Sequence, residues 1–510
     1  MRRSVAALAA AVMVSACASA PIRKQDQVSL ADARARLLEG CYDCLIEARD
    51  TFRRVAVGRA RPLLVTELFE AEVLIGMREQ EFAVDPTDTF ARAEALLPEL
   101  PPTYPGRRYL DLARLIPPDY VGTPRSEMNQ WNRKAPRLTE IRATQKELTA
   151  GPTVSPFVQY LSSSLNCLVP AVREINQALP KAPSDASPLV RYRTYTCPAP
   201  QMVALDPLFV QNPRFVEVEL IGARQPTLLV TAAYTKRKRD ALAAAAIRFP
   251  RSPSLSYTAG GLEQTVGDCK AAIRHYEDVI SLKPLHEDAA MQRVICLGHI
   301  GEFVPAIEGA TRIIDAKYDN FAEAYYWRAW THYQRKDLPN ARADIESARK
   351  VSVNQKVLLL GGMIKYDQGD LDPAESDLKD AIAMDRQGQQ CIAYWYYGLV
   401  GFSRQQWPET ALRFTRASSC YKRAVERSIK DLEDMKKADV DEDFRRSQIA
   451  GFEAAIKEDT DQEHASYLNA ANCYARAGDR EKAKEWLAKV PPSSVHALIA
   501  EQLRKEIGGS

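Results

Sequence analysis

The sequence predicts an all-α fold, a solenoid of stacked helix hairpins that fills the C-terminal half of the chain. Small residues that close successive helix pairs recur at gaps of 34, 35, 33 and 37 residues, then of 72, or about two repeats. A helix–turn–helix unit has about this length, and it stacks on its neighbours because it cannot bury its apolar face alone. The low count of 23 glycines also favours helix, and no alternating apolar run is long enough to require a sheet. The small residues are Ala272, Ala306, Ala341, Ala374, Ala411 and Ala483.

Length and charge narrow the class of protein. A chain of 510 residues is too long for one ordinary core, so we expect several domains or one long repeat array. Its 69 basic and 66 acidic residues leave a net charge of +3, which is too small to indicate a nucleic-acid partner. We therefore expect protein or peptide partners and no nucleic acid.

The first 16 residues read as an export signal. Arg2 and Arg3 precede an apolar stretch at 5–14, which is too short to span a bilayer. The stretch ends in Val-Ser-Ala-Cys, and this resembles the lipobox of bacterial lipoproteins, in which the cysteine, here Cys17, carries the acyl chains. Ala18 follows, a residue that goes with outer-membrane delivery in enterobacteria-like sorting. The resemblance implies a lipoprotein of the cell envelope facing the periplasm; plain secretion and an uncleaved anchor are the alternatives.

Residues 17–28 are expected to be a tether, and helices are expected from 29 onward. Small and large apolar residues at 44–55 fall as in the second helix of a repeat, so 29–125 is predicted to be a degenerate repeat region. Seven prolines between 98 and 125 break any long helix there, because proline lacks the N–H donor and clashes with the preceding turn. Residues 126–250 are predicted to form a middle helical region.

From about residue 251 the repeats come into register. Gly267 opens a turn, Ala272 closes the helix pair and Pro284 ends the copy. This pattern resembles the tetratricopeptide repeat family, which implies a right-handed α-α superhelix. The same register is kept by Tyr325, Gly369, Gly398, Tyr467, Tyr474 and Gly478.

The resemblance covers roughly 250–490, with departures. Lys336 stands where a turn glycine is expected, and Val294 stands where a small residue is expected. We predict the array at 251–420, an inserted or elongated helical hairpin at 421–461, and a final repeat with a capping helix at 462–510.

Ten cysteines in an exported chain suggest disulfides. Cys391 opens a first helix and Cys420 closes the antiparallel second helix, so the two ends should be neighbours. Cys167 and Cys197 flank a proline-containing stretch and could staple a loop.

Other cysteines allow more than one interpretation. Cys269 and Cys296 could meet, although two small buried side chains are favoured because Cys473 repeats the position of Cys296 without a visible partner. Cys41 and Cys44 form a C-x-x-C pattern in a helical context, which favours a local disulfide or core cysteines over redox or metal chemistry.

The sequence shows no catalytic signature. It has no H-E-x-x-H, no P-loop, no G-x-S-x-G and no G-x-G-x-x-G. None of the six histidines pairs with cysteines or carboxylates at metal-ligand spacing, and the acidic stretch at 439–443 lacks the glycine of a calcium loop. We expect no enzyme, no cofactor and no metal.

The better candidate for function is a groove. In the tetratricopeptide family the first helices line the concave face, and aromatic and methionine side chains there suit an extended or helical peptide. The alternative is that aromatic residues at helical spacing belong to the core. The transferred register places these residues in the groove: Tyr326, Trp330, Tyr333, Leu359, Met363, Tyr366 and Tyr396.

Three functional hypotheses follow. The first is a lipid-anchored scaffold of the bacterial envelope that binds proteins, within an outer-membrane assembly, pilus or secretion machine. The second is an enzyme or substrate-binding protein whose site lies in the N-terminal half, with the repeats as a docking module. The third is an architectural spacer. A deep polar pocket within 126–250 would favour the second hypothesis.

Overall fold

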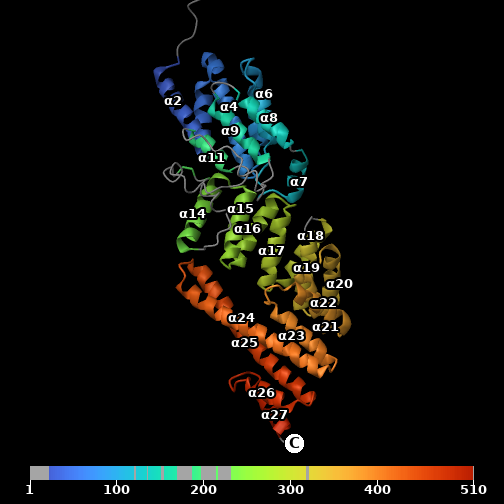
Figure 1. The fold of residues 1–510 in the computed structure, drawn as a ribbon. Coiled ribbons are helices and arrows are strands. Elements are labelled where there is room, and N and C mark those ends of the chain that lie inside the picture. The colour runs from blue at the N-terminus through green and yellow to red at the C-terminus, as the bar shows by residue number, and fades with distance from the viewer. Residues whose placement is uncertain are drawn as a thin grey trace, which may run out of the picture. The chain divides into compact units, whose positions relative to one another are not determined.

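The computed structural model describes residues 22–119, 122–134, 136–150, 154–168, 186–196, 214–215, 217, 231–317 and 321–508. Every regular element within these ranges is a helix, so the fold class is all-α, as predicted (Figure 1). The chain divides into two compact units. The first comprises 1–227, 237–259 and 281–286, and the second comprises 228–236, 260–280 and 287–510. Among the described helices, none has the length and apolar character needed to cross a bilayer.

The first unit is built from short and medium helices around one long one. Its helices are α2 (Lys24–Glu39), α3 (Tyr42–Val55), η1 (Gly58–Ala60), α4 (Arg61–Glu81), α5 (Thr87–Leu96), η2 (Leu97–Glu99), α6 (Gly106–Leu115), α7 (Arg125–Lys134), α8 (Leu138–Leu148), α9 (Pro156–Ser164), η3 (Leu165–Leu168), α11 (Pro188–Thr196), most of α14 (Ala232–Arg248) and the start of α15 (Pro253–Thr265).

Helix α4 is the centre of the first unit. A helix that is apolar on all sides belongs inside a core, and α4 buries side chains around most of its circumference. Leu64, Leu74 and Ile75 have no exposed surface. Close packing explains one glycine, because a Cβ at Gly76 would lie 2.5 Å from the ring of Phe90 on α5.

The first described helix begins earlier than the predicted tether allows. Helix α2 starts at Lys24 rather than after residue 28. Asp26 lies in its first turn, where a carboxylate interacts favourably with the positive end of the helix dipole. Residues 24–28 of the predicted tether are therefore helical, and 17–21 lie outside the described residues.

The second unit is a series of antiparallel helix pairs. After the end of α15 it contains α16 (Cys269–Leu282), α17 (Glu287–His299), α18 (Phe303–Asp315), α19 (Phe321–Gln334), α20 (Leu338–Val351), α21 (Gln355–Asp367), α22 (Leu371–Met384), α23 (Cys391–Ser403), α24 (Trp407–Lys437), α25 (Glu442–Arg476), α26 (Arg480–Ala488) and α27 (Ala497–Gly508).

The turns inside successive pairs share one backbone feature. Each contains a residue with a φ near +60° to +90°, in the left-handed region that glycine adopts without a steric cost. In two of the turns a side chain occupies this position instead, Lys336 with φ +60° and Gln405 with φ +58°. The turn residues keep the period of the repeat: Gly267, Gly301, Lys336, Gly369, Gln405 and Gly478.

Small residues allow the two helices of each pair to approach closely. A Cβ at Gly362 would lie 2.7 Å from Leu378, and one at Gly398 would lie 2.7 Å from Phe414, sixteen residues further along in both pairs. The bulky Val294 is accommodated because the residue opposite it is small: a Cβ at Gly309 would lie 2.8 Å from the Val294 side chain. A large side chain on one helix is therefore matched by a small one on the other, and the packing density is kept.

The predicted hairpin at 421–461 is elongated rather than inserted. Helix α24 runs unbroken for 31 residues and α25 for 35, so each is a repeat helix extended past the array. The extension returns to the start of the array, because a Cβ at Gly267 would clash with the hydroxyl of Ser447 on α25.

Candidate binding groove

The first helices α19, α21 and α23 carry the residues expected in a groove. Of the seven, Tyr326, Trp330, Leu359, Met363, Tyr366 and Tyr396 are half-buried. Tyr333 is buried, with 7% of its surface exposed. The register therefore brings most of these residues to a partly accessible face and leaves one in the core.

Three of them meet in a tyrosine cluster, which we define as Tyr333, Tyr366 and Tyr396. The Tyr333 hydroxyl donates to the Asp367 carboxylate at 2.8 Å and lies 3.0 Å from the Tyr396 hydroxyl. The Tyr366 and Tyr396 rings meet edge to face, with centroids 5.5 Å apart. Burial, the Tyr396 hydroxyl and the Asp367 carboxylate raise the pKa of Tyr333, so it stays a neutral hydrogen-bond donor.

The other expected groove residues pack between helices. The Trp330 ring lies across Gly298 of α17, where a Cβ would be 3.2 Å away, and it meets Phe303 edge to face. Tyr326 and Met363 pack against the core of α19, α20 and α21, and Leu359 packs against the next core along the array. The contacts of these residues are those of helix packing, which is the alternative that the sequence left open.

A groove that the sequence did not reveal lies between α23, α25 and α27. It is open and has a volume of about 630 Å³. Its polar lining includes the amides of Asn469, Asn472 and Gln502, and its apolar lining includes Trp395 and Ile499. Asn469 and Asn472 are three residues apart on one face of α25, and this amide pair is the sequence signal that could have identified the groove.

The last helix does not fully cover the end of the array. A capping helix is expected to present a polar outer face. Helix α27 instead leaves Leu498 82% exposed and Ile499 58% exposed, and Val495 just before it is also exposed.

The first unit contains a cluster of buried charged side chains. The fully buried guanidinium of Arg78 donates to Glu81 at 2.7 Å and to the Gly40 carbonyl at 2.7 Å, and it stacks over the Tyr192 ring at 3.7 Å. Arg193 forms a further ion pair with Glu81. Burial alone would raise the pKa of Glu81, but the charges of Arg78 and Arg193 outweigh it and lower the pKa.

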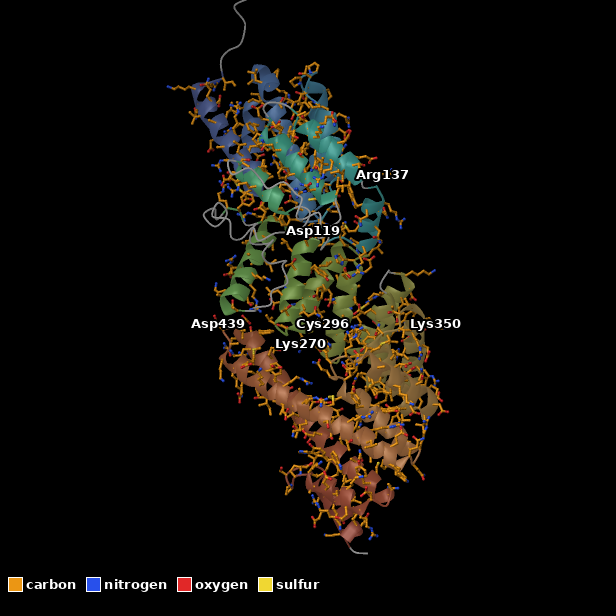
Figure 2. All side chains as sticks on the ribbon, in the orientation of Figure 1. Asp119, Arg137, Lys270, Cys296, Lys350 and Asp439 are labelled. Atoms are coloured by element: carbon orange, nitrogen blue, oxygen red, sulfur yellow. A yellow bond between two sulfur atoms is a disulfide. The ribbon has the colours of Figure 1, made fainter. Side chains whose placement is uncertain are left out.

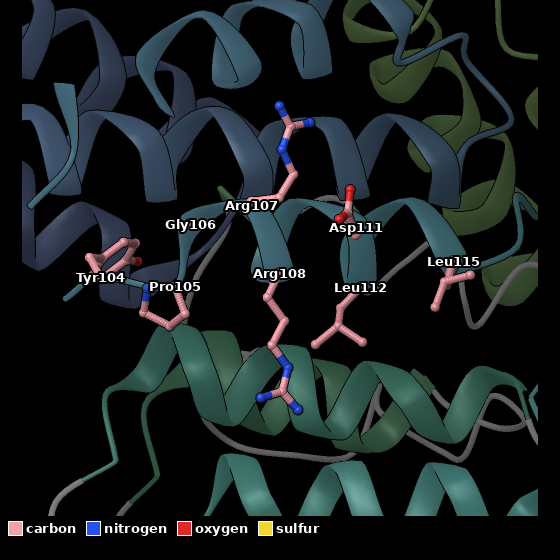
Figure 3. A pocket seen from close by; sticks show the side chains of 8 residues that line it. All are labelled: Tyr104, Pro105, Gly106, Arg107, Arg108, Asp111, Leu112 and Leu115. Carbon is pink, nitrogen blue, oxygen red and sulfur yellow. The ribbon is translucent and has the colours of Figure 1, made fainter. Parts of the chain in front are cut away.

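An open hollow of about 450 Å³ in the same unit lies along α6 (Figure 3). Figure 3 shows Arg107 and Arg108 pointing to opposite sides of this helix. Arg107 is bonded to Glu94 at 2.5 Å and Arg108 to Glu147. The two arginines at this hollow are therefore already held in ion pairs.

Two disulfides lie within the described residues. Cys391 and Cys420 are bonded, with their Cα atoms 5.4 Å apart, and Cys41 is bonded to Cys44. Glu39 joins the latter pair in a group with the spacing of metal ligands, but sulfurs that are bonded to each other are no longer thiolate ligands.

The remaining cysteines are placed as follows. The sulfurs of Cys269 and Cys296 lie 2.7 Å apart as thiols, and Cys296 is labelled on α17 in Figure 2. The hydrogen bond with Cys296, helped by His299, lowers the pKa of Cys269. Cys167 is disulfide-bonded, whereas Cys197 and Cys17 lie outside the described residues.

Comparison with known proteins supports the repeat assignment. A tetratricopeptide repeat family model matches residues 464–490, which span the end of α25 and all of α26. No curated protein resembles the sequence closely enough to count as a match.

Solved structures with a similar fold are tetratricopeptide repeat proteins and related solenoids. One from Parabacteroides merdae is 15% identical, with 54% of this chain and 93% of that one covered and a TM-score of 0.32. A thermophilic one from Thermus thermophilus is 18% identical, with 39% and 95% covered and a TM-score of 0.29. Yeast Tom70 is 12% identical, with 96% of each chain covered and a TM-score of 0.30. Residues 464–490 match the tetratricopeptide repeat family, and the stacked helix pairs of the second unit continue its repeat period.

Proposed function

We propose that the protein is a lipid-anchored scaffold of the bacterial cell envelope that holds an extended segment of a partner protein in the groove between α23, α25 and α27. The tetratricopeptide fold supports a scaffold for protein–protein interaction. The single observation that carries the proposal is the open groove, because its lining combines side-chain amides with apolar side chains.

The groove chemistry suits a peptide backbone. The amides of Asn469, Asn472 and Gln502 can each donate and accept, as the N–H and C=O groups of an extended chain require. Trp395 and Ile499 offer apolar surface to side chains of the same segment. Aromatic and aliphatic contacts supply most of the binding energy in such interfaces, whereas hydrogen bonds set the register.

Two features support a location in the cell envelope: the N-terminal signal and the disulfides. Cys17 in its lipobox-like context supplies the anchor. The Cys41–Cys44 and Cys391–Cys420 bonds suit an oxidising compartment such as the periplasm. We propose attachment to the outer membrane on its periplasmic side and service in an outer-membrane assembly, pilus or secretion machine.

The test is photo-crosslinking in the native envelope. A photoreactive residue at position 472 or 499 should crosslink to one and the same partner segment, identified by mass spectrometry. The matched control is Lys484, an exposed residue on the second helix of the same repeat, which should give no such product. Equal crosslinking from all three positions, or none from the groove positions, would contradict the proposal.

A further inference from the structure

We propose that Cys269 and Cys296 form a reversible disulfide that fastens the joint between two successive helix pairs at the start of the array. Cys269 is the first residue of α16, the second helix of one pair, and Cys296 lies on α17, the first helix of the next. Their sulfurs lie 2.7 Å apart as thiols. This bond acts on the array itself and is independent of what the groove binds.

The two sulfurs are already close to bonding distance. A disulfide has an S–S length of about 2.05 Å, so only a short approach separates the dithiol from the bond. Polar contacts beside the pair hold the same helices together. Arg293 on α17 is bonded to Glu277 on α16 at 2.8 Å, and Gln264 on α15 donates to Gln292 on α17 at 3.0 Å. These contacts keep the sulfurs opposite each other.

One of the two cysteines is accessible and the other is not. Cys269 is half-buried, whereas Cys296 has no exposed surface. The hydrogen bond with Cys296 lowers the pKa of Cys269, and the thiolate is the form of cysteine that attacks a disulfide. Cys269 is therefore the residue that meets an oxidant, and Cys296 is the residue that resolves the mixed disulfide.

The oxidant belongs to the disulfide class, of which glutathione disulfide is the simplest member. The Cys269 thiolate attacks one sulfur of the oxidant, which forms a mixed disulfide and releases one thiolate. That thiolate takes the proton of Cys296. The Cys296 sulfur then attacks the Cys269 sulfur and expels the second thiolate, which takes a proton from the solvent, where Cys269 had released its own. Two cysteine thiols are oxidised, one disulfide is reduced to two thiols, and the reverse exchange reopens the bond.

Exposure distinguishes this pair from the two disulfides whose sulfurs are all described. Cys391 and Cys420 are 5% and 1% exposed, and their bond lies within one pair, α23 with α24. Cys41 and Cys44 have no exposed surface. An exposed disulfide is more easily reduced than a buried one, so the bond at Cys269 should open under conditions that leave these two closed.

Cys473 provides a matched control, because it occupies the same repeat position as Cys296. It is buried on α25 as a free thiol. Burial raises the pKa of Cys473 to about 12, so this thiol stays protonated and unreactive.

The bond would act at a joint that contributes to the curvature of the array. Each helix pair touches only its neighbours, so the angles at successive joints add up along the chain. Cys269 lies two residues after Gly267, the turn against which Ser447 of α25 packs. Oxidation therefore fixes the joint where the elongated hairpin meets the array, and reduction releases it.

The experiment places the full chain in buffers that contain glutathione and glutathione disulfide at graded ratios. After an acid quench and unfolding, a maleimide reagent labels the free thiols, and peptide mass spectrometry assigns the labels. Cys269 and Cys296 should lose their labels together as the disulfide share rises and regain them when reduced glutathione is restored. Cys391 and Cys420 should stay unlabelled throughout.

Two variants sharpen this test. Cys269→Ser should leave Cys296 labelled at every ratio, with helix content unchanged by circular dichroism, because one oxygen replaces one sulfur at a half-buried position. Cys473→Ser should remove one label and leave the transition of the pair unchanged.

Three results would overturn the inference. Labels on both cysteines at every ratio would mean that no bond forms. A bond that survives an excess of reduced glutathione would be permanent rather than reversible. A lasting glutathione adduct on Cys269 would mean that Cys296 does not resolve it.

Hydrogen exchange tests the joint. In the oxidised protein the backbone amides of α16 and α17 should exchange several-fold more slowly than in the reduced protein, because the bond opposes local opening. The amides of α21 and α22, further along the array, should exchange equally in both states. Equal exchange of α16 and α17 in the two states would show that the bond does not fasten the joint, and would also overturn the inference.

Discussion

At the scale of single residues, the ionisation of the Glu70 carboxyl group can be tested near neutral pH. Glu70 lies on α4, with its carboxylate 2.9 Å from the Tyr104 hydroxyl. Burial raises its pKa to about 7, although the hydrogen bond from Tyr104 opposes the rise. The folded state therefore holds this proton more tightly than the unfolded state does. Its stabilising effect is complete below the ordinary carboxyl pKa and is lost as the pH rises through about 7.

We predict that Glu70→Gln removes this dependence, because glutamine cannot ionise. The free energy of unfolding of the variant should exceed that of the natural protein by roughly 2 kcal/mol at about pH 8 and by little at about pH 5. Urea denaturation followed by circular dichroism measures both values. The control Glu433→Gln, at an exposed position on α24, should show no such difference; a Glu70→Gln gain that is the same at both pH values would contradict the prediction.

The ion pairs of the buried charges could not be predicted from the sequence. Arg78 and Glu81 are neighbours on one helix, but Arg193 comes from a helix more than a hundred residues away. Their pairing depends on which helices pack together in the first unit, and no local pattern in the sequence encodes that. The Asp377–Lys365 pair of the array is closer in the chain, yet it too follows from helix packing rather than from a motif.

At the scale of a single element, the turn at Gln405 is strained by its side chain. Its φ of +58° is one that glycine adopts freely and other residues adopt at a cost of about 1 kcal/mol. Gln405→Gly should therefore raise the free energy of unfolding by up to about 1 kcal/mol, after allowance for the greater freedom of glycine in the unfolded chain.

The matched control is the same chemical change at Gln334, an exposed residue at the end of α19. That position is helical, so Gln334→Gly should lower the stability by about 0.5–1 kcal/mol. Thermal and urea unfolding of both variants measure the free energy of unfolding. A lower value for Gln405→Gly than for the natural protein would contradict strain at this turn.

These turns explain why the repeats were predictable. A left-handed residue, a small residue and an apolar face recur at one period, and each is written locally in the sequence. Tyr333 and Tyr366 occupy the same position in successive copies, each three residues before its turn residue, whereas Tyr396 lies nine residues before Gln405, so its place beside them depends on how α23 packs. Trp330 shows the limit of that argument, because its contact with Gly298 depends on the neighbouring pair of helices. The groove beside α27 was missed because three helices must converge to form it.

At the scale of the whole molecule, the lipid anchor that we propose at Cys17 would hold the protein at the membrane. We predict that Cys17→Ala releases the protein from the membrane fraction, because more than one acyl chain is needed for stable attachment and this variant carries none. Fractionation of cells with an alkaline wash measures the change. Tight membrane association of the variant, with its helix content unchanged, would exclude Cys17 as the anchor.

The contact between Ser447 and the Gly267 turn has a mechanical consequence. An array of stacked hairpins resembles a spring, because each pair touches only its neighbours and small adjustments add up along its length. The paired helices α24 and α25 run back like a strut from the late repeats to the first one. An array held at a fixed curvature loses less conformational freedom when it binds a partner segment. This preorganisation should raise the affinity for the segment.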